Sequence, residues 1–167
     1  MPVSSLADIK VTVANAVWIA TALLQRKNRE AVFSTEEIVK MVKAEKLSDS
    51  KEHVIAQHVR QHCVANRLPQ PNTVCMLTAL GRGDRRLFRE GDKVEAGRNP
   101  ERTHPDPKDI PPQYHELIRW YEKEWFPRNP KIQDPLLAAA GTGRTVWKID
   151  AVLYVQQLRE EHQAGNL

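Results

Sequence analysis

Cysteine is scarce in this chain, which has only Cys63 and Cys75 among its 167 residues. Two thiols cannot form the disulfide framework of a small secreted domain, and they fit a reducing compartment in which each is a small core residue. The sequence has no C-x-x-C pair, the usual mark of a structural zinc site. His58 and His62 have the spacing of a helical metal-binding pair, but they fall on the predicted buried arc of their helix. We therefore expect neither a metal nor another cofactor.

The chain also lacks a long uninterrupted apolar run. Its most apolar stretch, Val11–Leu24, is too short to span a bilayer and contains polar residues. A signal peptide needs a positively charged start, but Asp8 offsets Lys10 here. We interpret the stretch as part of a core helix over about Ser5–Lys27, and we expect a cytoplasmic protein with no membrane segment.

A recognisable arrangement of catalytic groups is missing as well. The stretch Ala138–Thr145 departs from the phosphate-binding loop G-x-x-x-x-G-K-[ST] at its first glycine and at its lysine. Cys63 and His62 are neighbours on a predicted helix, so their side chains point about 100° apart and form no nucleophile–base pair. We expect that the protein is not an enzyme.

A strong net charge is absent, since the formal net charge is only +4. The positive charge is nevertheless clustered: the segment Arg82–Arg89 contains four arginines and one aspartate. A solvated surface hairpin and a phosphate-contacting hairpin can both have this composition. The clustering, directly after a polar-faced helix, favours contact with a polyanion.

The predicted elements follow the order helix, short strand, helix, helix and hairpin. Ala31–Phe33 is the short extended piece, and a capping box at Ser34 and Glu37 begins the second helix. Two strands, Thr73–Leu80 and Arg85–Glu90, flank a glycine-containing turn. This order predicts a mainly α fold with a small β-hairpin: a winged helix-turn-helix domain followed by a C-terminal helical extension.

The third predicted helix, about Ser50–Asn66, has one mainly apolar arc and one polar arc, with Val64 on the polar one. Asn66 is expected to end it in a left-handed conformation. On the polar arc, Arg60 can pair with guanine, and the glutamines with adenine. We predict that the helix enters the major groove while the hairpin arginines contact phosphate or the minor groove. The predicted DNA contacts are Lys51, His53, Gln57, Arg60, Gln61, Arg82, Arg85, Arg86 and Arg89.

Prolines mark a change of character after the hairpin. We predict a winged-helix domain over residues 1–91, a proline-rich connector over 92–112 and a helical extension over 113–167. Five of the ten aromatic residues lie close behind the connector, more than one buried stripe requires: Tyr114, Trp120, Tyr121, Trp125 and Phe126. We therefore expect some of these rings to pack on the winged-helix body or on another chain, and a homodimer through these helices would use Tyr114, Trp120, Tyr121 and Trp125.

Several motifs carry a resemblance to a known group. His58–Asn66 reads HVRQHCVAN and Gly81–Asp92 reads GRGDRRLFREGD. Together with PKDIPPQYHELIRWY at Pro107–Tyr121 and DPLLAAAGTGRTVW at Asp134–Trp147, they resemble a group of small prokaryotic proteins taken to carry winged helix-turn-helix domains. The similarity covers about Thr35–Leu158 and implies a fold. It implies no substrate, cofactor or operator.

The sequence therefore leads to one main hypothesis and one alternative. The main hypothesis is sequence-dependent binding of double-stranded DNA, by a prokaryotic transcriptional regulator or a DNA-binding component of a mobile-element or defence locus. The alternative is a non-catalytic protein–protein adaptor built on a winged-helix scaffold, because a fold does not fix a function. Binding of duplex DNA as a function of salt separates the two.

Overall fold

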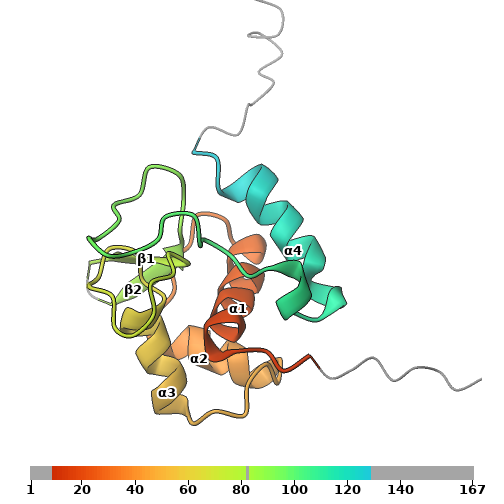
Figure 1. Cartoon of the computed structure of the whole chain (residues 1–167). Helices are drawn as coiled ribbons and strands as arrows, with labels where there is room; N and C mark the ends of the chain where they lie inside the picture. The colour runs from red at the N-terminus through yellow and green to blue at the C-terminus, as the bar shows by residue number, and fades with distance from the viewer. Residues whose placement is uncertain (1–8, 82, 129–167) are drawn as a thin grey trace, which may run out of the picture. The chain divides into compact units, whose positions relative to one another are not determined.

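One helix, α1 (Val13–Lys27), forms the centre of the fold in the computed structural model, which describes residues 9–81 and 83–128. Nearly every residue over Ala14–Ala22 is buried, as expected for a helix that is apolar on all sides. Figure 1 shows α2, α3, the hairpin and α4 arranged around it. The interpretation of the apolar stretch as a core helix is confirmed. No helix among the described residues is long and apolar enough to cross a membrane.

The start of α1 differs from the prediction. The Thr12 side chain accepts a hydrogen bond from the Asn15 N–H at 3.2 Å, so the helix begins at Val13. The predicted cap, Ser5, lies outside the described residues. The local sequence pattern predicted the helix correctly. It did not predict which of several hydroxyl residues caps the N-terminus of the helix.

The second helix, α2 (Thr35–Ala44), has the predicted capping box. The Ser34 N–H donates to the Glu37 carboxylate at 2.7 Å, and the Glu37 N–H donates to Ser34 Oγ at 3.3 Å. These bonds satisfy two N–H groups at the start of the helix, and the pKa of Glu37 is lowered chiefly by the bond from the Ser34 backbone. The connection to α3 is held by Lys43, whose Nζ donates to the carbonyl oxygen of Ser50 at 2.5 Å.

The third helix, α3 (Glu52–Gln57), continues as a π-helical turn over His58–His62. The Cys63 N–H donates to the His58 carbonyl at 3.0 Å, which closes this wider turn. Asn66 does not end the helix in a left-handed conformation, since Lys46 is the one non-glycine residue with positive φ in the described part of the chain. Its side-chain amide instead exchanges two hydrogen bonds with the backbone of Ala79, at 2.9 and 3.0 Å. The predicted cap was wrong because a strand edge competes for the amide.

The hairpin consists of β1 (Leu77–Leu80) and β2 (Asp84–Leu87), paired antiparallel. Gly81 and Gly83 have φ of +56° and +107° in the turn, which explains why the sequence needs glycine there. Phe33 extends the sheet by one bridge, since its backbone N–H and C=O bond to Arg85 at 2.8 Å each. The fold is therefore mainly helical with a small antiparallel hairpin.

The predicted division of the chain at residues 91 and 112 is not found. The described residues on both sides of these positions belong to one compact unit, and the segment 92–112 bonds to its body. Its backbone bonds to two distant segments: the N–H of Glu95 donates to Ala65 at 2.8 Å and that of Asn99 to Thr73 at 2.9 Å. The prolines shape a surface strap, with short 3-10 turns at Pro107–Asp109 and Pro112–Tyr114. Of the predicted 113–167 extension, residues from 129 onward lie outside the described residues.

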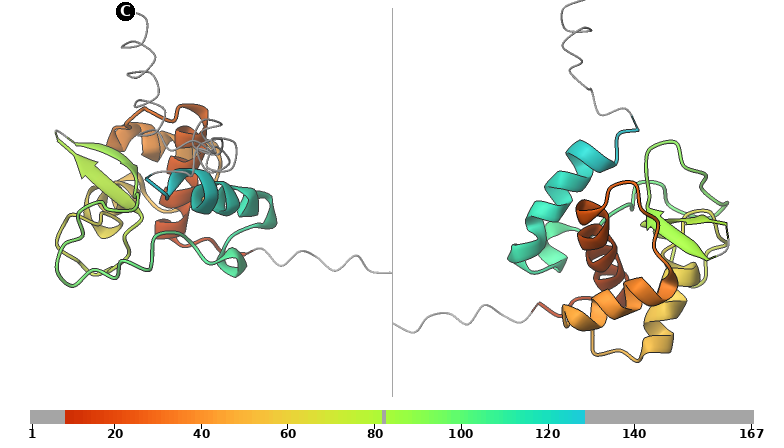
Figure 2. Two further views of the ribbon diagram at one scale, coloured as in Figure 1. Left: turned by 90° about the horizontal axis from the view of Figure 1, so that it is seen from above. Right: turned by 180° about the vertical axis from the view of Figure 1, so that it is seen from behind.

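The aromatic segment begins with α4 (His115–Trp120) and a π-helical turn (Tyr121–Trp125), and it packs on α1. Figure 2 shows α4 alongside α1 from two further directions. Tyr121 and Trp125 are 0% and 1% exposed, and the rings of Tyr121 and Trp18 meet edge to face with centroids 5.5 Å apart.

The predicted dimer surface is wrong for most of its residues. Tyr114 is buried like Tyr121 and Trp125, so these rings are covered within the chain and are not available to a second copy; Trp120 is half-buried. The other expectation, that the rings pack on the body of the fold, holds for these residues, because α4 and the turn after it share a core with α1.

Replacing Tyr121 with phenylalanine is expected to cost about 1–2 kcal/mol, because the buried Phe88 carbonyl loses its hydroxyl donor at 2.9 Å. Burial also raises the pKa of Tyr121, which keeps the hydroxyl neutral as a donor. Urea unfolding measures the change. The matched control is Tyr114→Phe, whose hydroxyl lies 3.4 Å from Glu45 and is expected to change stability by less than about 0.5 kcal/mol. Equal losses in the two variants would contradict this role for the Tyr121 hydroxyl.

Candidate nucleic-acid interface

The outward face of α3 presents most of the residues predicted for base contact. Lys51, His53, Gln57 and Arg60 are exposed, and Gln61 is half-buried. Val64, predicted on the same arc, is fully buried, because the chain leaves the helical path after the π-helical turn. The face of α3 is therefore polar along its whole length.

Arg85 does not belong to this face. Its side chain is 3% exposed and reaches under the end of the helix. Nε donates to the Val59 carbonyl at 3.0 Å, and one terminal nitrogen to the Arg60 carbonyl at 3.2 Å. Burial lowers the pKa of its guanidinium, and the neighbouring charges of Arg67 and Arg60 lower it further. The prediction that Arg85 contacts phosphate was wrong, because the donors that would bind phosphate bind the helix instead.

Arg98 is a second buried arginine, and sequence reasoning missed it. It is 6% exposed and has no carboxylate partner among the described residues. Its five N–H groups lie within 2.6–3.1 Å of six carbonyl oxygens, so one N–H is shared between two of them; the acceptors are Gln61, His62, Arg67, Leu68, Asn72 and Val74. An arginine in a polar, proline-rich stretch carries no sequence signal that it is buried.

Together the two arginines close the end of the helix. Arg85 donates hydrogen bonds to the carbonyl oxygens of residues 59 and 60, and Arg98 donates to those of residues 61 and 62. The last carbonyls of a helix normally lack partners and carry partial negative charge, which the two cations offset. The end of α3 and the loop after it are therefore held from beneath by the interior of the protein.

The other hairpin arginines are also engaged. Arg86 forms a bidentate pair with Asp92, with both N–O distances 2.7 Å and only 14% of the arginine side chain exposed. The Arg89 guanidinium carbon lies 3.6 Å from the ring centroid of Trp125, a cation–π contact. Arg86 is therefore paired, whereas Arg89 is half-buried against Trp125 and forms no ion pair among the described residues. Arg82 lies outside the described residues.

The exposed positive charge is found instead at the far end of α3. Arg60 and Arg67 are both exposed and form no ion pair within the described part of the chain. Arg67 was not predicted, since it falls after the helix pattern. A hollow of about 510 Å³ lies between α3 and the following loop; its lining residues are Gln57, Arg60, Gln61, Asn66, Arg67, Leu68 and Glu95.

The histidines and cysteines next to this surface are packing groups. The rings of His58 and His62 meet edge to face at 4.5 Å, and both are half-buried rather than buried. Burial lowers the pKa of His62, and the charges of His58 and Arg98 lower it further. Burial raises the pKa of the Cys63 thiol to about 12, so it is unreactive near neutral pH. The described residues contain no group of three His, Cys, Asp or Glu side chains placed to hold a metal ion.

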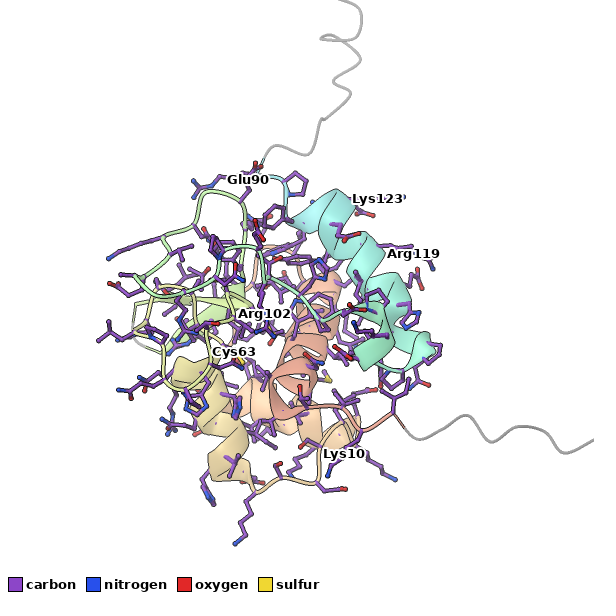
Figure 3. All side chains as sticks on the ribbon, viewed as in Figure 1. Lys10, Cys63, Glu90, Arg102, Arg119 and Lys123 are labelled. Atoms are coloured by element: carbon purple, nitrogen blue, oxygen red, sulfur yellow. The ribbon has the colours of Figure 1, made fainter. Side chains whose placement is uncertain are left out.

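Figure 3 shows where the labelled charges lie around the fold. Cys63 follows the π-helical turn after α3, while Arg119 on α4 and Lys123 in the turn after α4 lie on the other side of α1. Comparison gives no relative. The chain matches no family model, no curated protein and no solved structure. Its surface chemistry is therefore the basis for any functional conclusion.

Proposed function

We propose that this chain binds double-stranded DNA through α3, on a winged-helix scaffold, as a prokaryotic transcriptional regulator or a DNA-binding component of a mobile-element or defence locus. The observation that carries the proposal is the exposed α3 face with two unpaired arginines, Arg60 and Arg67, at its end. Long polar side chains on a helix suit base edges, and unpaired arginines suit phosphates.

The order of elements supports the winged-helix part of the proposal. A central helix is followed by a bridging residue, two helices and a hairpin, and Phe33 pairs with β2. In DNA-binding proteins of this kind the later helix of the pair enters the major groove.

The buried arginines support the DNA-binding part. A recognition helix must hold its side chains in place before it meets DNA, because each group ordered on binding costs affinity. Arg85 and Arg98 fix the end of α3 without using any exposed charge. Arg60 and Arg67 consequently remain available to a polyanion. In this proposal Arg60 and Arg67 contact the phosphates in place of Arg85, Arg86 and Arg89. Arg82 remains a candidate contact.

Salt-dependent binding tests the proposal. Fluorescence anisotropy with a duplex of about 30 base pairs, between about 50 and 200 mM salt, is expected to give a steep log–log slope. The double variant Arg60→Ala, Arg67→Ala is expected to reduce that slope by about two and to weaken binding at least tenfold at the lower salt.

The matched control is Arg119→Ala, which removes an exposed arginine on α4 and is expected to change the slope by much less. Circular dichroism confirms that all variants are folded. If the wild-type chain does not bind duplex DNA even at about 50 mM salt, DNA binding is wrong and the adaptor function is favoured.

A further inference from the structure

Leu68 is the most exposed large hydrophobic side chain among the described residues, at 64%. It lies in the loop between the π-helical turn and β1, beside Arg67. Isolated surface leucines are common and usually need no explanation. Leu68 differs from them in the way that its backbone is held and in the charge that surrounds it.

The loop that presents Leu68 is fixed at many points. Arg98 donates hydrogen bonds to the carbonyls of Arg67 and Leu68 at 2.9 and 3.1 Å, and to two more carbonyls further along the loop. Pro69 and Pro71 restrict the backbone, and Pro69 packs against Gly97 so closely that a Cβ there would lie 3.2 Å from its ring. The exposed leucine is therefore presented by a loop whose backbone is already held, so little backbone conformational entropy is lost when the side chain is buried against a partner.

The surroundings of Leu68 are polar and positive. It lines the same hollow as Gln57 and Arg60 of α3, and Arg67 precedes it in the chain. One carboxylate, Glu95, lines that hollow with them. An exposed leucine flanked by unpaired arginines complements a nucleic acid better than an apolar protein surface or a lipid tail. Phosphates supply the negative charge that pairs with the arginines, whereas an apolar surface would desolvate them without a counter-charge.

The length of α3 places this loop relative to DNA. The six residues of α3 and the five of the π-helical turn span about 15 Å, against about 12 Å for the width of the major groove. If α3 crosses the groove, its end reaches the phosphate backbone, and the loop that follows reaches the adjacent minor groove. Apolar side chains at such positions can enter between base pairs, unstack them and kink the duplex.

We propose that Leu68 is a wedge that inserts into the minor groove beside the α3 site and bends the bound DNA, with Arg60 and Arg67 holding the phosphates on either side. This inference rests on the proposed DNA binding and adds a deformation of the DNA to it. The variant Leu68→Ala leaves the loop intact, because its side chain is mostly exposed and the loop is held through backbone carbonyls.

Energy transfer between dyes at the two ends of a duplex measures the bend. Binding of wild-type protein is expected to raise the transfer efficiency, as a kink of about 20° or more shortens the end-to-end distance. Leu68→Ala is expected to bind with less than about tenfold loss of affinity but to leave the transfer at its value for free DNA. Leu68→Met, which keeps an apolar side chain of similar size, is expected to restore the bend.

The fluorescence of 2-aminopurine placed at successive steps of the duplex gives a second readout, because the base brightens when it is unstacked. Wild type and Leu68→Met are expected to brighten one step, and Leu68→Ala none. Binding without a bend, or an equal bend with Leu68→Ala, overturns the wedge while leaving DNA binding in place. Absence of binding by the wild-type chain overturns the DNA-binding proposal itself.

Discussion

Replacing Arg98 with methionine is expected to lower the free energy of unfolding by about 3–5 kcal/mol. The buried guanidinium donates its five N–H groups to six carbonyl oxygens, one of them in a buried bond and five in part-buried bonds, and methionine can replace none of these bonds. Each buried carbonyl left without a donor costs about 1–3 kcal/mol, and water entering the gap recovers part of the total. The loss is therefore expected to be large but less than additive.

Urea unfolding followed by circular dichroism measures this loss. Arg98→Lys is expected to lose at least half as much, since an ammonium has three donors and cannot span the positions that the planar guanidinium reaches. The control is Arg102→Met, an exposed arginine four residues on, which is expected to change stability by less than about 0.5 kcal/mol. An Arg98→Met variant within about 1 kcal/mol of wild type would mean that the loop carbonyls are satisfied by water and not by Arg98.

The elements that the sequence predicted correctly are those set by local chemistry. The capping box at Ser34 depends on residues three apart, and the hairpin turn depends on glycines at positive φ. The polar face of α3 follows from its period, and it was predicted in the right place. Each of these signals is complete within a few residues, so no knowledge of the rest of the fold is needed.

The predictions that were wrong concern features that depend on contacts between distant residues. Four arginines in Arg82–Arg89 look alike in the sequence, yet Arg85 is buried under α3 and Arg86 is paired with Asp92. An exposed and a buried arginine have the same local pattern, and only the position of helix carbonyls in the fold distinguishes them. The proline-rich strap failed for a similar reason: prolines predict an extended backbone but not whether that backbone lies on the protein.

These corrections move the candidate DNA contacts along α3. The hairpin supplies little free charge among its described residues, whereas the end of α3 and its loop supply Arg60, Arg67 and Leu68. Arg85 connects the two regions, because it comes from β2 and bonds to two carbonyls of the π-helical turn that continues α3. In the proposed mode of DNA binding, the hairpin therefore contributes indirectly, because Arg85 holds the end of the helix in place.

Asp92 is the second position at which one substitution is expected to have a large effect. Its carboxylate is 4% exposed and accepts two hydrogen bonds from Arg86, one from the Thr78 hydroxyl and one from the Arg89 N–H, all at 2.7–2.8 Å. Asp92→Asn leaves Arg86 without its counter-charge and turns an amide group toward its donors. We expect a loss of about 3–5 kcal/mol at neutral pH. Glu90→Gln, an exposed carboxylate two residues away, is the control and is expected to be neutral.

The effect of Asp92→Asn is also expected to depend on pH. Burial raises the pKa of Asp92, but the hydrogen bonds from Arg86, Thr78 and the Arg89 backbone outweigh burial, so the pKa lies below its ordinary value of 3.8. A carboxylate with a depressed pKa stabilises the fold above the unfolded-state value and loses that contribution as the pH falls through the folded-state value. The difference in unfolding free energy between wild type and Asp92→Asn should therefore be constant from about pH 7 to 5 and shrink below about pH 4. If the difference in unfolding free energy stays constant below about pH 4, then packing of the Asp92 side chain, and not its charge, stabilises the segment around it.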